Sequence, residues 1–200
     1  AHRIEGIGDK HVPWIHNVKN TDLVIALDDN VIVRLARLFN EPAGREYLVG
    51  QGVPEGLVQK LDLLGFSGIA NLSMAVKFAK YYELGEHDLV LTVLTDSMDL
   101  YRSRLQEMQA EHGDYTEVHA AADFARYLQG LTTDGMLELR YPDRRRVHNL
   151  KYFTWVEQQG RTHAELVAQW QDPEYWTRIQ AQVPQIDGLI EAFNQRVGLR

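Results

Sequence analysis

The sequence predicts an α/β fold in which a parallel sheet covered by helices is followed by an all-α C-terminal extension. Two short apolar runs, Leu23–Leu27 and Leu89–Leu94, have the pattern of strands that are buried on both faces of a parallel sheet. The residues between these runs show the helical spacing of apolar side chains. Beyond Met98 the β-branched runs disappear, and helix-forming, aromatic and charged residues take their place. We therefore assign residues 1–108 to the α/β portion and residues 109–200 to the helical extension.

The first part of the chain is expected to form a loop, a strand and two helical regions, in that order. Residues 1–21 contain Gly, Pro and Asn in turn-forming positions, which predicts a loop. After the first strand, Asp28 or Asp29 can cap a helix whose apolar residues recur at i, i+3, i+4 and i+7. A second helical region is expected over residues 45–64, with Gly and Pro interrupting it between 50 and 54.

The segment Gly65–Gly68 follows as a turn and opens a third helix from about Asn71. In this helix the apolar positions form one stripe, which leaves Lys77 and Lys80 facing water. The second strand, Leu89–Leu94, comes next. This alternation of strands and helices is typical of parallel sheets with helices on both faces.

The extension is expected to be helical, with breaks at Gly and Pro. The expected helices lie near residues 100–111, 116–129, 144–159, 162–169 and 186–197. Its apolar material is largely aromatic and comprises Tyr152, Phe153, Trp155, Trp170, Tyr175 and Trp176. Such side chains more often pack on a neighbouring domain or a second subunit than form a ligand site.

Composition excludes several classes of protein. Hydrophobic residues make up 44% and charged residues 24% of the chain, as in globular proteins, and no apolar run approaches the ~20 residues of a membrane helix. The absence of cysteine excludes disulfide scaffolds and thiol nucleophiles and fits a reducing, cytoplasmic compartment. A net charge of -7 argues against binding to nucleic acid.

The beginning of the chain is compatible with two origins. It opens with Ala1 rather than Met and runs directly into glycine-bearing turns, as expected of a segment from the middle of a longer protein. Removal of the initiator methionine from a natural start would give the same beginning. Both origins stay open.

Three segments place small or hydroxyl residues where an apolar run meets a turn or a helix start, which is where α/β proteins bind ligands. The three segments are Ile4–Gly8, Gly65–Gly68 and Leu91–Ser97. Their order and spacing resemble the C-terminal half of the cysteine synthase and cystathionine β-synthase family. These are pyridoxal-phosphate enzymes of fold type II, the tryptophan synthase β-like fold, so the resemblance implies that the α/β portion belongs to a cofactor-binding domain.

The resemblance implies that the first and third segments lie against the cofactor. Gly6, Ile7 and Gly8 would allow the backbone to lie against the cofactor ring and the substrate. Asp96 and Ser97 would lie beside the pyridine nitrogen. Without the resemblance, a Gly-x-Gly sequence is most often a plain turn, and an Asp-Ser pair after a strand is an ordinary helix cap.

Ser67 matches the family serine that hydrogen-bonds the pyridine nitrogen of pyridoxal phosphate. A carboxylate at this position would hold the nitrogen protonated, whereas a neutral hydroxyl restrains carbanion formation and favours elimination at the β-carbon. The family often has glycine two residues after the serine, where this chain has Ile69. The alternative is that Ser67 only caps a helix.

The resemblance also implies parts that this sequence lacks, namely the Schiff-base lysine, an asparagine-containing substrate loop and a glycine-rich phosphate cup. Lys10 and Lys19 fall in expected turns, and Lys77 and Lys80 on the wet face of a helix, so none is a suitable replacement. We therefore expect no catalytic residue in this chain. The lysine and the phosphate-binding residues would come from the N-terminal part of the same protein, without which the chain would be inactive.

Two other clusters give weaker signals. His2, His11 and His16 lack the i, i+4 spacing of helical metal ligands, so we expect no metal site. The segment Arg144–Arg146 with His148 could bind an anion, although a solvated helix face is the commoner explanation for such a run.

The sequence thus predicts the C-terminal portion of a pyridoxal-phosphate-dependent lyase or transferase of amino-acid metabolism. By resemblance, the reaction is β-elimination or β-replacement on a serine- or cysteine-type amino acid, and the enzyme is a cytoplasmic homodimer. The helical tail is a candidate for the dimer interface. The alternative is a non-catalytic partner or regulatory subunit that binds through this tail.

Overall fold

The computed structural model of the chain describes Ile4, Gly8 and residues 11–199. It is 63% helical, and the sheet in the described part has two antiparallel strands, β1 (Leu23–Ile25) and β2 (Met136–Glu138). The prediction of a parallel-sheet α/β domain of the tryptophan synthase β-like type is therefore wrong. The prediction of an all-α extension is also wrong in one respect, because β2 lies within residues 109–200.

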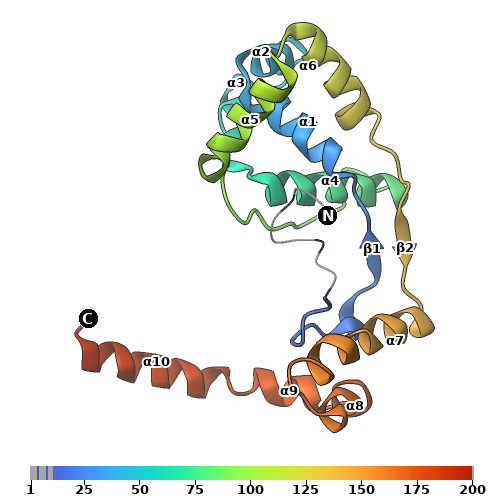
Figure 1. The fold of residues 1–200 in the computed structure, drawn as a ribbon, viewed down its shortest axis with the longest axis vertical. Helices are drawn as coiled ribbons and strands as arrows, with labels where there is room; N and C mark the ends of the chain where they lie inside the picture. The colour runs from blue at the N-terminus through green and yellow to red at the C-terminus, as the bar shows by residue number, and fades with distance from the viewer. Residues whose placement is uncertain (1–3, 5–7, 9–10, 200) are drawn as a thin grey trace. The chain divides into compact units, whose positions relative to one another are not determined.

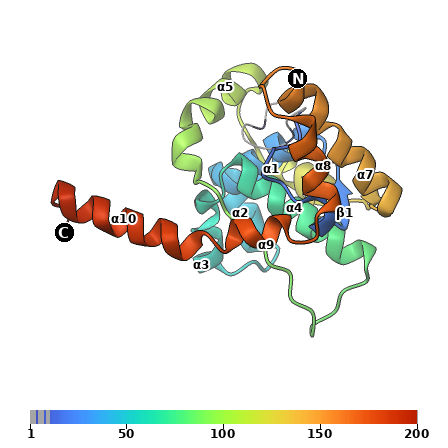
Figure 2. The same cartoon turned by 90° about the horizontal axis from the view of Figure 1, so that it is seen from below.

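The two apolar runs that predicted a parallel sheet behave differently from each other in the structure. The first contributes β1, which pairs with β2 and is half-exposed. The second forms no strand, and Leu89 and Leu91 are 83% and 85% exposed. Figure 2 shows this segment as part of the long connection that follows α4. A continuous apolar run identifies a segment that can be buried on both faces, but a strand also needs neighbouring backbone to pair with.

The chain divides into two compact units, which are described separately. Unit 1 comprises Ala1–Asp9 and Val24–Leu137, and unit 2 comprises Lys10–Leu23 and Glu138–Arg200. The predicted boundary between residues 108 and 109 falls inside a helix of unit 1. As a statement about functional domains, that boundary stays a prediction.

Unit 1 is built from short helices (Figure 1). Its α-helices are α1 (Asp29–Asn40), α2 (Pro42–Gly50), α3 (Glu55–Val58), α4 (Phe66–Tyr81), α5 (Arg102–His112) and α6 (Glu117–Asp123). Two 3-10 helices, η2 (Leu61–Leu63) and η3 (Met98–Tyr101), and a π-helix, η4 (Phe124–Gln129), complete it. None of the helices described in either unit is both long enough and apolar enough to cross a membrane.

The core of unit 1 forms around α1. Asp28 caps this helix by accepting a hydrogen bond from the Asn30 amide, as the sequence predicts. Its apolar residues are almost fully buried, and α2, α4 and α6 pack against it. The close approach of α2 requires glycine at position 44, because a Cβ there would lie 2.2 Å from the carbonyl oxygen of Leu38.

Helix α4 begins earlier than the sequence predicts and buries a different face. It starts at Phe66 rather than near Asn71, and Lys77 is 3% exposed rather than facing water. The Lys77 ammonium donates to the carbonyl oxygen of Ala26 at 3.1 Å and to the carboxylate of Asp134 at 3.3 Å. The spacing of apolar residues predicted the wrong buried face of α4. A long cationic side chain such as Lys77 can be buried when its charged end has hydrogen-bond acceptors.

Unit 2 is also helical. It contains the 3-10 helix η1 (Val18–Asn20), the α-helices α7 (Tyr141–Asn149), α8 (His163–Gln171), α9 (Tyr175–Gln180) and α10 (Val183–Val197), and the π-helix η5 (Tyr152–Val156). The sequence predicts most of these helices, but not α9. Both views show α10 running on from α9 with no other helix of unit 2 packed alongside it (Figure 1, Figure 2).

Lys151 lies at the centre of unit 2 and is fully buried. Its ammonium donates to the carbonyl oxygens of Trp14 at 2.9 Å and His16 at 2.6 Å, and to the side-chain oxygen of Gln169 at 2.9 Å. It also lies 5.5 Å from the ring centroid of Trp176. Three donors and three acceptors match, so the charge is satisfied although burial lowers the pKa of Lys151 to about 8.

We expect replacement of Lys151 by methionine to destabilise unit 2 by about 1–3 kcal/mol, because it leaves buried carbonyl oxygens without a donor. Urea denaturation followed by tryptophan fluorescence measures the change. Lys60→Met is the matched control, since the Lys60 side chain is exposed, and it should change stability little. Equal stability of Lys151→Met and the parent chain would show that these hydrogen bonds contribute nothing net.

Candidate functional site

The second predicted segment forms the start of α4. Gly65 is the N-cap residue and has an extended backbone, so Ser67 is the second residue inside the helix. Ser67 is 4% exposed. The alternative interpretation, in which Ser67 is the helix cap, therefore does not describe this helix.

The third predicted segment lies directly against the start of α4. The amide of Gly65 donates to the carbonyl oxygen of Asp96 at 2.9 Å. A Cβ atom on Gly65 would lie 2.0 Å from Oδ1 of Asp96, so a side chain at this position would displace the carboxylate, which also accepts a hydrogen bond from Tyr101. Two segments that are thirty residues apart in the sequence are thus joined by a backbone hydrogen bond and by close packing.

Aromatic residues stabilise this junction. The Tyr101 hydroxyl donates to Oδ2 of Asp96 at 2.6 Å, and the Tyr101 ring stacks on Phe66 with centroids 4.8 Å apart. Ser97 occupies the N-cap position of η3 without a side-chain capping hydrogen bond, and the first residue of η3, Met98, is buried in the core of unit 1. We call this group the α4 site, and it consists of Gly65, Phe66, Ser67, Asp96, Ser97 and Tyr101.

The first predicted segment is only partly described. Ile4 is buried in the core cluster of unit 1, and Gly8 is exposed with a φ of +75°. The predicted cofactor contacts Gly6 and Ile7 lie outside the described residues. The structure therefore brings together the segments that carry Ser67, Asp96 and Ser97, through the contacts of Gly65 with Asp96 and of Phe66 with Tyr101, and leaves the glycine segment untested.

Phe66 is the member of the α4 site that sequence reasoning missed, and the contact of Tyr101 with Asp96 was also not foreseen. The stacking of Phe66 on Tyr101 could not be predicted from sequence spacing, because the two residues belong to segments that are far apart in the chain. The one available signal was the aromatic residue inside each of two glycine- or hydroxyl-bearing segments.

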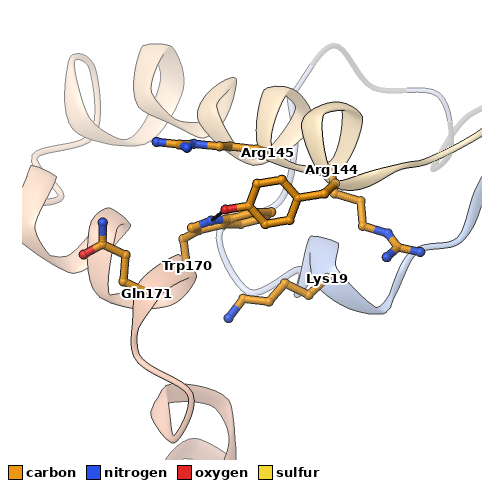
Figure 3. A pocket seen from close by; sticks show the side chains of 6 residues that line it. Lys19, Arg144, Arg145, Trp170 and Gln171 are labelled. Carbon is orange, nitrogen blue, oxygen red and sulfur yellow. Dashed lines mark hydrogen bonds between the residues drawn. The ribbon is translucent and has the colours of Figure 1, made fainter.

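Unit 2 contains a separate cavity of about 470 Å³ (Figure 3). The residues that line it are Lys19 from η1, Tyr141, Arg144 and Arg145 from α7, and Trp170 and Gln171 from α8. The sequence predicts a solvated helix face for the run Arg144–Arg146, with an anion site as the alternative, and two of these arginines line the cavity. Only the fold brings Lys19 and Trp170 beside these arginines, since more than a hundred residues separate Lys19 from them in the sequence.

Other perturbed groups in unit 1 are structural. Burial raises the pKa of both Tyr115 and Asp123, and the Tyr115 hydroxyl donates to the Asp123 carboxylate at 2.9 Å. The Arg37 guanidinium lies 4.9 Å from the Tyr115 ring centroid and donates to the carbonyl oxygen of Gly113. The polar atoms of these groups are hydrogen-bonded inside the core, and none of the three side chains lines a pocket of the described residues.

Comparison with known proteins adds no relative. The chain matches no family model, and it matches neither a curated protein nor a solved structure.

The close contact between Gly65 and Asp96 implies that a side chain at position 65 lowers the free energy of unfolding. Gly65→Ala should destabilise unit 1 by about 1–3 kcal/mol, because the added methyl group overlaps the Asp96 carboxylate. The loss should be smaller when the same change is made in an Asp96→Ala background, which removes the overlapping atoms. Thermal denaturation of the four proteins gives the coupling energy.

Gly56→Ala is the control for this experiment, because nothing lies within 4 Å of a Cβ at that position in α3. It should be neutral or slightly stabilising. A Gly65→Ala protein as stable as the control would rule out the close junction between the two segments.

Proposed function

We propose that this chain supplies the ring-nitrogen side of a pyridoxal-phosphate site in an enzyme of the cysteine synthase type. The observation that carries the proposal is the junction of Gly65–Gly68 with Asp96 and Ser97 in the α4 site. Each of these segments carries a hydroxyl residue of a kind that can hydrogen-bond a cofactor. Their convergence supports a common binding role and does not depend on the parallel sheet, which the structure lacks.

The residues of the α4 site fit one side of the cofactor. Pyridoxal phosphate acts as an electron sink when its aldehyde carbon is linked to an amino acid. A serine hydroxyl beside its pyridine nitrogen can donate a hydrogen bond without protonating that nitrogen. Ser67 has the required group. Since it is almost fully buried, we expect a ring to bind only when the side chains that cover it move aside.

Asp96 has a positioning role in this proposal. Its carboxylate accepts a hydrogen bond from Tyr101, its carbonyl oxygen accepts one from Gly65, and it thereby holds the start of α4 in place. A carboxylate held in this way orients the segment around Ser67 while the neutral hydroxyl faces the ring nitrogen. The division of roles matches β-elimination or β-replacement better than transamination, because a neutral partner weakens the electron sink.

The two lysines of α4 are unsuitable as the Schiff-base lysine, which supports a source for that lysine outside this helix. Lys77 donates to Ala26 and Asp134, and Lys80 donates to the carbonyl oxygens of Gln129 and Leu131 at 2.9 and 2.8 Å. Both ammonium groups therefore hold backbone segments together and are poorly suited to act as nucleophiles. In this proposal the lysine and the phosphate-binding residues lie on another polypeptide segment.

Binding of pyridoxine 5′-phosphate tests the proposal. This ligand keeps the ring nitrogen and the phosphate, but its alcohol cannot form Schiff bases with surface lysines. Because the phosphate-binding residues lie on another segment in this proposal, we expect weak but saturable binding to the 200-residue chain by isothermal titration calorimetry. Ser67→Ala should weaken it by about 1 kcal/mol, roughly fivefold in Kd, because one hydrogen bond to the ring nitrogen is lost.

Ser73→Ala is the matched control, since Ser73 is also buried on α4 and lies outside the α4 site, where its hydroxyl donates to the carbonyl oxygen of Ile69. It should leave the affinity unchanged. Absence of saturable binding at millimolar ligand, or equal weakening by both variants, would remove the support for a cofactor role of the α4 site.

Helix α10 favours a second candidate function, which is association through the helical tail. None of its residues is buried, and Ile190 and Phe193 are 51% and 61% exposed. The helix ends at Gly198, which has a left-handed backbone. Apolar residues recur along one face at alternating spacings of three and four and comprise Val183, Ile186, Ile190, Phe193 and Val197.

A second copy of the chain is the partner that fits this face. Alternating spacings of three and four are the seam of a two-stranded coiled coil, in which each helix covers the same face of the other. Val183, Ile190 and Val197 occupy one set of seam positions and Ile186 and Phe193 the other, so apolar residues fill the seam along the whole helix. An identical helix therefore buries the whole seam and needs no other protein.

Phe193→Glu should convert the dimer to a monomer, because the charge would be buried within the seam. Gln195→Glu makes a similar addition of charge on the opposite face and should leave the dimer intact. Sedimentation velocity across a range of concentrations measures both. A parent chain that stays monomeric at every concentration would exclude this association, and it would leave the proposal for the α4 site unaffected.

A further inference from the structure

We propose that the cavity lined by Lys19, Arg145 and Trp170 in unit 2 binds a small organic phosphate monoester. This site is separate from the α4 site and does not rest on the cofactor proposal. Every residue that lines it belongs to unit 2. Its volume of about 470 Å³ is in the range of small-molecule sites.

The cavity collects positive charge in a chain whose net charge is -7. Lys19, Arg144 and Arg145 line it, and no acidic residue does. Arg144 is already engaged, since its guanidinium donates to the carbonyl oxygen of Thr21 at 2.8 Å and to the carboxylate of Asp22 at 2.6 Å. Figure 3 shows its guanidinium directed away from Trp170.

Lys19 and Arg145 are the two cations that remain for a ligand. Within the part of the chain that the structure describes, neither forms an ion pair with a carboxylate. In Figure 3 the two side chains lie on opposite sides of the Trp170 indole. The Lys19 ammonium is 5.8 Å from the Trp170 ring centroid, so it lies close to the aromatic wall.

Two cations of this kind match a dianion better than a monoanion. A phosphate monoester carries about two negative charges at neutral pH, whereas a carboxylate carries one. An arginine fork and a lysine ammonium are also the usual donors to phosphate oxygens in proteins. The ligand class is therefore a phosphate monoester rather than a simple carboxylate.

The rest of the cavity provides a wall for the organic part of the ligand. Trp170 donates from its indole nitrogen to the Tyr141 hydroxyl at 3.3 Å, and their ring centroids are 5.5 Å apart. This contact fixes the two rings in an edge-to-face arrangement. Gln171 follows Trp170 at the end of α8 and adds a polar amide.

The positions of these residues are held by buried contacts behind the cavity. His148 lies one turn from Arg145 on α7 and is buried, with its ring 5.2 Å from that of Trp170 and its Nε2 atom 3.0 Å from the carbonyl oxygen of Leu166. Helix α7 is thereby fixed against α8, and the cavity is present before a ligand arrives. A preformed site loses less conformational entropy on binding.

Phenyl phosphate and benzoate are the probes that test this site, and isothermal titration calorimetry with the full chain is the measurement. We expect phenyl phosphate to bind saturably and benzoate to bind at least about tenfold more weakly, because it offers one charge fewer. Lys19→Gln and Arg145→Gln should each weaken phenyl phosphate by about tenfold. Circular dichroism and thermal denaturation confirm that the variants fold.

Arg146→Gln is the matched control. It removes the same charge from the next residue of α7, which is exposed and does not line the cavity. Its affinity should equal that of the parent chain. Equal weakening by Arg145→Gln and Arg146→Gln would show a diffuse electrostatic attraction and overturn the site, as would equal affinity for benzoate or no saturable binding.

A final comparison separates this site from the α4 site. Phenyl phosphate has no ring nitrogen, so Ser67→Ala should not alter its binding. Pyridoxine 5′-phosphate is itself a phosphate monoester, so both ligands are titrated against Ser67→Ala and Arg145→Gln. Pyridoxine 5′-phosphate binding that Arg145→Gln weakens and Ser67→Ala leaves unchanged would contradict the cofactor proposal alone. Phenyl phosphate binding that Arg145→Gln leaves unchanged would contradict the phosphate site alone.

Discussion

Within each unit of this protein, hydrogen bonds from long cationic side chains to backbone carbonyl oxygens join segments that are distant in the sequence. Much of the chain is irregular or forms short helices, so many carbonyl groups have no partner in a sheet. Buried carbonyl groups need a donor, and cationic side chains can reach from one segment to another. The bonds join Arg37 to Gly113, Lys77 to Ala26, Lys80 to Gln129 and Leu131, and Lys151 to Trp14 and His16.

This arrangement places positive charge inside an acidic protein. Removing an ammonium group from water is costly unless hydrogen bonds replace the hydration, and Lys151 shows that condition met with three acceptors. Every buried side-chain nitrogen and oxygen of the described residues has a hydrogen-bond partner. The cations of the cavity beside Trp170 differ, because Lys19 and Arg145 are not used in this way and can interact with a ligand.

The α4 site depends on both sequence and packing. Ser67, Asp96 and Ser97 could be selected from the sequence, because hydroxyl and carboxyl residues at turns are recognisable one segment at a time. The sequence pattern predicted that these residues would be close only because it predicted a parallel sheet, and that sheet prediction is wrong. The contact instead follows from Gly65, whose missing side chain makes room for Asp96, and from the stacking of Phe66 on Tyr101.

The sequence by itself determined the local features of this protein. The capping of α1 by Asp28, the apolar face of that helix and the positions of α5, α8 and α10 all follow from contacts between residues a few positions apart. Only the tertiary structure decided which segments pair. The run Leu89–Leu94 has strand composition without a strand neighbour, and Lys77 is buried because Ala26 and Asp134 supply distant acceptors. The reason is physical, because burial and hydrogen bonding at these positions are set by partners that lie dozens of residues away.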